Sequence, residues 1–261
     1  MNNILKKGLS TFDIKVLGIT LMFIDHIHQM FAPMGAPGWL DWFGRPVATI
    51  FFFVSVIGFS HTHDKKKYML RLYISMFLMG LFTYFIGKLV EFPQVVLINN
   101  IFRDLFIGTV MMYAIDVIVS GKNTKNILKI IAGIILFLLP TILSLLIPLI
   151  FSPSLSSNHI LFLLITSALP AILLAENTIT VFLIPALYLA RDNRIVQCAL
   201  IIIVSSIFMI VGDSQWIMIF SIIPILLYNG KKGRGMKYFF YIFYPAHIAI
   251  LYLISAYIYN H

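Results

Sequence analysis

Residues 127–150 read ILKIIAGIILFLLPTILSLLIPLI, and Lys129 is the single charged residue in this stretch. A transmembrane α-helix needs about 20 predominantly apolar residues to cross the hydrocarbon core of a bilayer. The rest of the 261-residue chain has the same character, because 60% of its residues are hydrophobic and only 11% are charged. An ordinary soluble domain has about 25% charged residues. The sequence therefore predicts an all-α bundle of transmembrane helices that forms one integral-membrane domain, residues 1–261.

Apolar runs of similar length recur along the whole chain, and we expect nine or ten spans joined by short loops. Two of these runs are short and are separated by Ala175–Asn177 alone, so they are either two thin spans or one broken helix. The predicted spans are 12–31, 43–60, 68–87, 102–119, 127–150, 159–174, 178–190, 196–211, 214–229 and 238–258.

The basic residues gather in short clusters between these runs, as Lys and Arg do in cytoplasmic loops. Lys6, Lys7 and Lys15 predict a cytoplasmic N-terminus, and HDKKKYMLR (63–71) and GKNTK (121–125) predict cytoplasmic loops. If 159–190 crosses once, there are nine crossings and an external C-terminus; if it crosses twice, there are ten. Because topology accounts for the net charge of +9, the predicted partner is the lipid bilayer and not a nucleic acid.

The first span contains LGITLMFIDHIHQMF (17–31), in which Asp25, His26 and His28 interrupt an apolar run. An ionisable group inside lipid costs roughly 2.5–3.5 kcal/mol on insertion scales, so it normally faces a protein interior or a wet cavity. These residues either lie near the outer headgroups or line a cavity in which His26 is a general base. In the second case Asp25 fixes its tautomer or raises its basicity. Adjacent helical residues diverge by about 100°, so only His26 would touch the substrate.

Polar residues also interrupt other spans, and each has a simpler interpretation. Arg45 opens the second span, where an Arg commonly extends toward the interface. Arg103 and Asp104 could form an interfacial pair, and His61 and His63 lack a third ligand nearby, so we expect no metal site. The Gly-flanked basic loop 230–237 can present backbone amides and cations to phosphate, or simply anchor a cytoplasmic loop. His247, near the middle of the last span, could be an ordinary hydrogen-bonded interior histidine.

Four segments in this order resemble the TraX family: LGITLMFIDHI (17–27), FGRPVATIFFFVSVIGFSHTHDKKKYMLRL (43–72), NNIFRDLFIG (99–108) and IIPILLYNGKKG with KYFFYIFYPAHIAILYLI (222–233 and 237–254). The namesake of that family is linked to N-terminal acetylation of conjugative pilin. The family is grouped with multi-span membrane acyltransferases, which include the acyltransferase-3 group and heparan-α-glucosaminide N-acetyltransferase. The resemblance thus implies a multi-pass protein of the bacterial cytoplasmic membrane.

The resemblance also implies roles for individual residues. His26 and Asp25 correspond to the catalytic pair, although His28 stands where a small residue is expected, which leaves open which histidine is the base. The donor would be acetyl-CoA or another acyl-CoA. Its expected binding residues are Arg45, Arg103, Tyr228, Asn229, Lys231, Lys232, Arg234 and Lys237, and the expected substrate-cavity residues are Asn99, Asn100, Tyr244 and His247.

These expectations describe an acyltransferase that moves an acetyl group from cytoplasmic acyl-CoA to an amine or hydroxyl in or across the membrane. His26 takes the acceptor's proton or carries the acyl group. The acceptor could be a pilin-like protein N-terminus, a glycan, a lipid or a peptide. The alternative is a proton-coupled transporter or flippase of an anionic or acylated precursor, for which broken, Pro-rich spans would be suitable. The absence of a detectable internal repeat counts against the alternative.

Overall fold

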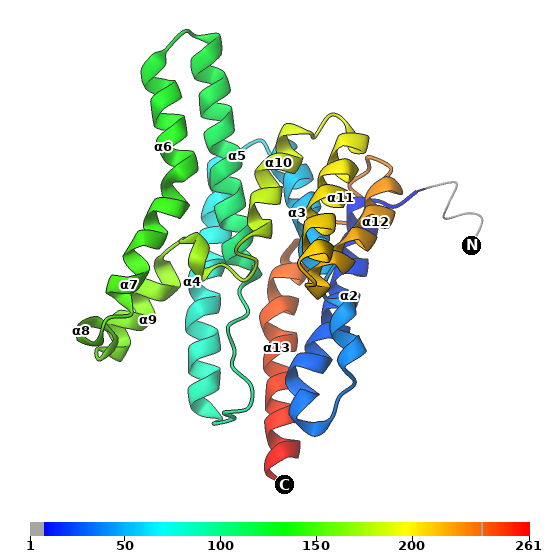
Figure 1. Cartoon of the computed structure of the whole chain (residues 1–261), viewed down its shortest axis with the longest axis vertical. Coiled ribbons are helices and arrows are strands. Elements are labelled where there is room, and N and C mark those ends of the chain that lie inside the picture. Colours follow the sequence, from blue (N-terminus) through cyan, green and yellow to red (C-terminus); the bar gives the residue numbers. More distant parts are fainter. Residues whose placement is uncertain (1–7, 236) are drawn as a thin grey trace. The chain divides into compact units, whose positions relative to one another are not determined.

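The computed structural model describes residues 8–235 and 237–261, with the side chain of Lys237 outside the described part. Within these residues the chain is helical, and its β-structure is a single parallel bridge between Leu9 and Tyr228. The predicted all-α class is therefore confirmed (Figure 1). The α-helices are α2 Thr11–Phe31, α3 Val47–Ser60, α4 Lys65–Leu89, α5 Ile101–Asn123, α6 Ile127–Leu143, α7 Ile147–Ile150, α8 Pro153–Ser156, α9 His159–Ala168, α10 Leu183–Leu189, α11 Arg194–Ile210, α12 Ile222–Leu226 and α13 Lys237–Asn260. Short 3₁₀ segments are η1 Ala32–Met34, η2 Gly38–Phe43, η3 Ser144–Leu146, η4 Ile172–Leu174, η5 Thr180–Phe182 and η6 Ser214–Ser221.

Five helical segments of the described chain are long and apolar enough to cross a membrane, which confirms a multi-pass membrane protein. They coincide with five of the predicted spans, and the predicted first span is α2. Four shorter apolar helices fall within the remaining predicted spans, so the exact number of crossings stays a prediction. The five long segments are Gly38–Ser60, Lys65–Leu89, Ile101–Asn123, Ile127–Ile150 and Tyr238–Asn260. The shorter helices are His159–Ala168, Thr180–Leu189, Arg194–Ile210 and Ser214–Leu226.

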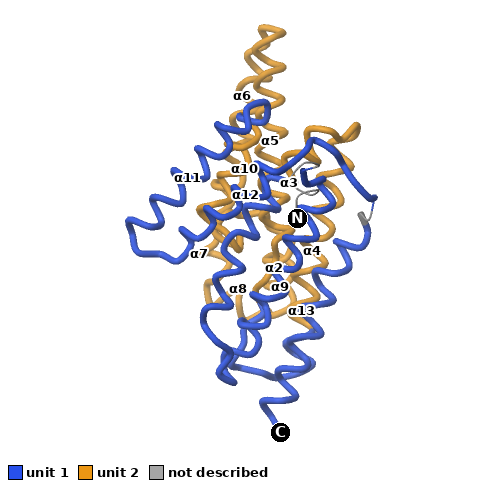
Figure 2. Tube along the Cα trace, turned by 90° about the vertical axis from the view of Figure 1, so that its right-hand side faces the viewer, with its two compact units in different colours: residues 1–54, 86–97, 190–261 blue, residues 55–85, 98–189 orange. Residues whose placement is uncertain are grey.

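The chain forms two compact units, coloured separately in Figure 2. Unit 1 contains residues 1–54, 86–97 and 190–261, and unit 2 contains residues 55–85 and 98–189. Helices α3 and α4 each begin in one unit and end in the other, so neither unit is a continuous segment of sequence. The single domain expected from the sequence remains a prediction.

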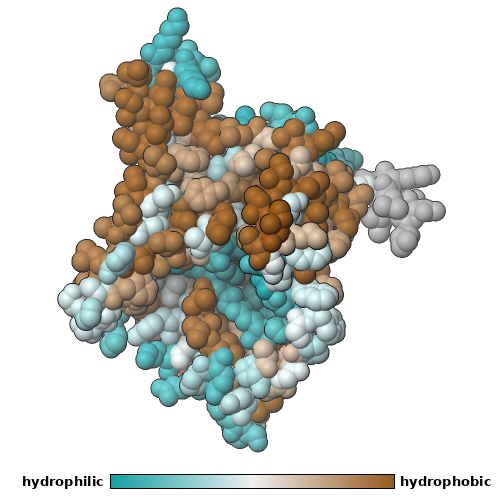
Figure 3. Space-filling model, in the orientation of Figure 1, coloured by the Kyte–Doolittle hydropathy of each residue, from teal (hydrophilic) through white to brown (hydrophobic). Residues whose placement is uncertain are grey.

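In unit 2, α5 and α6 form a long antiparallel hairpin. A Cβ atom on Gly133 would lie 3.0 Å from the Ala114 carbonyl oxygen, so this glycine lets the two helices approach closely. Only 17% of the Ile127–Ile150 window is buried. Apolar side chains cover its outer surface, and hydrophilic residues occupy the tip of the hairpin (Figure 3). This pattern is that of a lipid-facing helix pair with a polar turn at the interface.

The helix over 159–190 is interrupted, which agrees with the sequence alternative of one broken helix. Helix α9 ends at Ala168, and Leu169 is extended with ψ 116°. Pro170 accounts for this end, because proline disfavours helical backbone in the residue before it and cannot donate a hydrogen bond itself. The chain then forms η4 and η5 before α10 begins at Leu183.

Hydrogen bonds within unit 2 give the direction of this broken segment. The backbone amide of Glu176 donates to Asp104 in the first turn of α5 (2.9 Å), and the Tyr188 hydroxyl donates to Asp116 farther along α5 (2.7 Å). Residues 176–188 therefore run parallel to α5. Lys65, at the start of α4, also contacts Asp116 (2.6 Å). The segment thus ends at the level where α4 begins, which favours a single crossing.

Candidate functional site

The centre of the site in unit 1 is a pair of buried histidines, one from each of two long helices. His26 lies on α2 and His247 on α13, and each side chain is 3% exposed. The Nδ1 atom of His26 is 2.7 Å from the Nε2 atom of His247. Of the two histidines in the first span, His26 is the buried one and His28 is half-buried. The two histidines that the sequence offered as the base therefore differ in burial, and the choice between them stays a prediction.

Aromatic rings surround this pair. The Tyr244 ring centroid is 6.4 Å from that of His26 and 5.8 Å from that of His247, and Tyr244 is itself buried. Phe243 stacks on His247 with 4.8 Å between ring centroids. The Phe23 ring also packs against His247, with 6.3 Å between the two centroids. The histidine pair therefore has a largely aromatic surround. The two predicted cavity residues of α13, Tyr244 and His247, thus lie beside the predicted base.

The Asp25 carboxylate lies against the start of the second predicted span. A Cβ atom built on Gly44 would lie 2.2 Å from the Asp25 carboxylate oxygen, so the carboxylate packs directly on the Gly44 backbone. The Nδ1 atom of His26 contacts His247, and the expected influence of Asp25 on His26 stays a prediction. Gly44 is the residue that permits this approach, since any side chain there would clash with Asp25.

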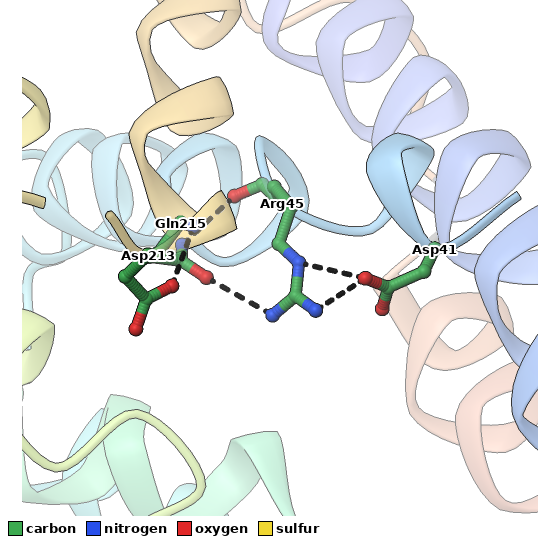
Figure 4. Close-up of polar contacts among 4 residues, drawn as sticks. All are labelled: Asp41, Arg45, Asp213 and Gln215. Carbon is green, nitrogen blue, oxygen red and sulfur yellow. Dashed lines mark hydrogen bonds and ion pairs between the residues drawn. The ribbon is translucent and has the colours of Figure 1, made fainter. Parts of the chain in front are cut away.

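Arg45 follows Gly44 and is held in a small polar network (Figure 4). Its guanidinium forms an ion pair with Asp41 and donates to the Gln215 amide oxygen (3.4 Å). The Gln215 amide donates back to the Arg45 carbonyl (3.2 Å), and the Gln215 backbone N–H donates to Asp213 (2.7 Å). Sequence reasoning missed Asp41 and Gln215. The spacing of Asp41 four residues before Arg45 was an available signal, whereas Gln215 had none.

The basic turn, residues 230–235, is tied by its backbone to the start of α2. The amides of Thr11 and Phe12 donate to the carbonyls of Lys231 (2.8 Å) and Lys232 (3.2 Å). Gly233, at φ +70°, packs so tightly on Ser10 that a Cβ atom would lie 2.3 Å from its hydroxyl. Ser10 is the N-cap of α2, so the first amides of that helix are satisfied by protein atoms.

The expectation that backbone amides of the turn bind phosphate remains a prediction, although one of these amides is already bonded within the protein. The Lys231 amide donates to the Asn229 side chain (2.9 Å), and the Asn229 amide donates to the Leu9 carbonyl (2.9 Å). The carbonyls of Lys231 and Lys232 accept hydrogen bonds from the start of α2, while the side chains of Lys231, Lys232 and Arg234 are exposed. These three cationic side chains are therefore accessible to an anion at the turn. The fourth predicted cation, Lys237, has its side chain outside the described residues.

Tyr228 and Asn229 hold the turn in place. The Tyr228 hydroxyl accepts from Thr11 (3.2 Å), and its carbonyl accepts a short hydrogen bond from Arg194. The Arg194 guanidinium also lies over the Tyr228 ring, 5.0 Å from its centroid. Arg194 was not among the predicted site residues. It adds another cation beside the basic turn, at the start of α11.

The remaining predicted residues, Arg103, Asn99 and Asn100, belong to unit 2. Arg103 donates to the carbonyls of Thr166 and Leu174, both at 2.6 Å. The Asn100 side chain donates to the Met76 carbonyl (2.9 Å), and Asn99 is buried. Asp104 accepts from the backbone amides of Glu176 and Asn177, so the pair Arg103–Asp104 is directed at the broken segment 159–190. No group of three possible metal ligands occurs among the described residues.

Comparison with known proteins identifies one relationship. Neither a curated protein nor a solved structure matches the chain. The family described as TraX protein matches residues 10–255, a range that includes both histidines of the pair, Arg45 and the basic turn. Because the match covers nearly the whole length, the chain belongs to the TraX family.

Proposed function

We propose that this protein is a membrane acyltransferase that moves an acetyl or other acyl group from cytoplasmic acyl-CoA to an amine or hydroxyl of an acceptor. The observation that carries the proposal is the buried contact between His26 and His247, in the predicted first span and the last span. Intramembrane ionisable residues are rare and mark functional sites. Histidine is the side chain most often used as a general base, and general-base catalysis contributes about 10²–10⁴-fold in rate.

The proposed roles of the other residues follow from charge and position. Lys231, Lys232 and Arg234 bind the phosphates of the donor at the end of α2 that the positive-inside rule assigns to the cytoplasm. Arg45 stabilises the developing oxyanion, because Gly44 beside it packs on Asp25, the neighbour of His26. Fifteen residues of α2 separate Thr11 from His26, which corresponds to about 22 Å. The donor would therefore bind in an extended form.

The proposed acceptor is a chemical class, an amine or a hydroxyl, and not one identified molecule. Membership of the TraX family supports a pilin-modifying role, with a pilin-like protein N-terminus as the acceptor. A glycan, a lipid or a peptide would satisfy the same chemistry. We place the protein in the bacterial cytoplasmic membrane with its N-terminus inside, since the basic clusters follow the positive-inside rule.

The test uses inside-out membrane vesicles that contain the full-length protein and are given radiolabelled acetyl-CoA. We expect label in the protein or glycolipid fraction, a loss of about 10²–10⁴-fold in His26→Ala, and little loss in His28→Ala. The His28 variant is the matched control, because it removes a histidine from the same helix.

Equal incorporation by the wild type and His26→Ala would contradict the proposed role of His26. Label that accumulates inside the vesicles without incorporation into any acceptor would favour the transporter alternative over the transferase.

A further inference from the structure

The hydrogen atoms of the histidine pair can be assigned from its partners. The Nδ1 atom of His247 is 2.8 Å from the Phe243 carbonyl oxygen, one helical turn earlier. A carbonyl oxygen only accepts, so this Nδ1 atom carries the hydrogen. A neutral imidazole has one N–H group, and the Nε2 atom of His247 is then a lone-pair acceptor. The hydrogen in the 2.7 Å contact must belong to Nδ1 of His26.

We propose that His247 is a positioning residue that fixes the tautomer of His26. This inference rests on the proposed function, in which His26 is the base. With its hydrogen on Nδ1, His26 has its lone pair on Nε2, the atom on the far side of the ring from His247. His26 thus receives from a histidine on α13 the orientation that a carboxylate gives to the base of a Ser-His-Asp triad.

The surroundings hold the pair in this arrangement. The two rings are nearly parallel, with 3° between their planes, and Phe243 stacks on His247 at 13°. The opposite tautomer of His26 would set two lone pairs against each other across 2.7 Å, or require His247 to give up the Phe243 carbonyl. Either change leaves a buried polar group unpaired, which is unfavourable in an apolar surround.

The proton balance follows from this assignment. When the acceptor attacks the acyl carbon, its N–H or O–H bond breaks and the proton moves to Nε2 of His26, while Nδ1 keeps its bond to His247. The thioester bond then breaks, and the CoA sulfur takes the proton from Nε2 as it leaves as a thiol. The pair returns to its starting state, and His247 neither gains nor loses a proton in the cycle.

The test reads the tautomer directly by ¹⁵N NMR of full-length protein in lipid nanodiscs, labelled at histidine. His26 signals are assigned by their absence in His26→Ala. We expect a protonated Nδ1 and an unprotonated Nε2 in His26. We expect His247→Gln to retain this pattern and most of the transferase activity, because the amide oxygen can accept from Nδ1–H. His247→Leu should lose the pattern and reduce transfer by at least about 10-fold, within the range of a general base.

His261 provides the matched control. Its Nδ1 atom also contacts the carbonyl four residues earlier, that of Tyr257 at 3.0 Å, but the side chain is exposed. His261→Leu should change neither the His26 signals nor the activity. A protonated Nε2 in wild-type His26, or a wild-type pattern retained in His247→Leu, overturns the inference. If His247→Leu does not fold, loss of the pattern in His247→Gln overturns it.

The transferase role of His26 and the role of His247 in fixing its tautomer can be disproved independently. The expected tautomer together with full activity in His26→Ala would overturn the transferase role of His26 and leave the role of His247 in fixing its tautomer intact.

Discussion

At the scale of single residues, Arg103 makes two backbone contacts that its position in the sequence did not indicate. Its two guanidinium hydrogen bonds satisfy the carbonyls of Thr166 and Leu174, on either side of the break after α9. Backbone carbonyls without partners are costly in lipid, and an interrupted span survives where neighbouring groups satisfy them. Arg103 is therefore placed to stabilise the broken segment, and donor binding by Arg103 remains a prediction.

Replacing Arg103 separates these two roles. Hydrogen bonds to a charged group contribute about 1.5–3 kcal/mol each, so we expect Arg103→Met to lower the free energy of unfolding by about 3 kcal/mol or more. The measurement is thermal unfolding in detergent, with protease cleavage between residues 168 and 177 as a local readout. The exposed Arg234→Met is the control for loss of charge. An unchanged melting temperature with weakened acyl-CoA binding would assign Arg103 to the donor site.

At the scale of elements, the basic turn combines a fixed backbone with free side chains. Its carbonyls are bonded to the first amides of α2, the helix that carries His26. The helix N-terminus is consequently capped by the chain itself, and the turn contributes charge through its exposed lysines and arginine. Exposed ionic contacts contribute about 0.2–1 kcal/mol each and weaken with salt.

A triple substitution tests the turn as an element. Changing Lys231, Lys232 and Arg234 together to Gln should weaken acyl-CoA binding by roughly 3- to 150-fold, with a smaller difference at high salt. Isothermal titration with acetyl-CoA measures the affinity. The control replaces Lys122, Lys125 and Lys129, at the tip of the α5–α6 hairpin, with Gln, which removes equal charge. Equal affinity in the wild type and the triple variant would reduce the turn to a topological anchor.

At the scale of the whole molecule, the basic clusters and the path of 159–190 agree on nine crossings. The single pass of that segment in unit 2 ends at Tyr188, beside Lys65 and Asp116, so the following RDNR (191–194) should share a side with HDKKK (63–67). The connection from α11 to the basic turn supports this assignment within unit 1, because Arg194 contacts Tyr228.

Single cysteines introduced after Cys198→Ser test this topology in intact cells. Cysteines at positions 63, 192 and 232 should be protected from an impermeant maleimide, whereas one at position 154 should react from outside. Reaction at 192 and 232 together with protection at 63 would establish ten crossings and move the basic turn away from cytoplasmic acyl-CoA.

The sequence by itself determined the all-α class and the approximate positions of the long apolar helices. These features are local, because a bilayer requires about 20 apolar residues wherever the chain crosses it, and a charged residue in such a run is visible without its neighbours. The short runs on either side of Ala175–Asn177 already indicated a break. The N-cap Ser10 and the turn residue Gly233 are also local features. The contact between them joins distant parts of the sequence and is not local.

Only the tertiary structure decided which polar groups meet. His247 lies 221 residues from His26, Gln215 lies 170 residues from Arg45, and the carbonyls bound by Arg103 are those of residues 166 and 174. Helical periodicity gives the face on which a side chain lies but not the helix that covers this face. The buried partner of His26, His247, follows from the packing of α2 against α13.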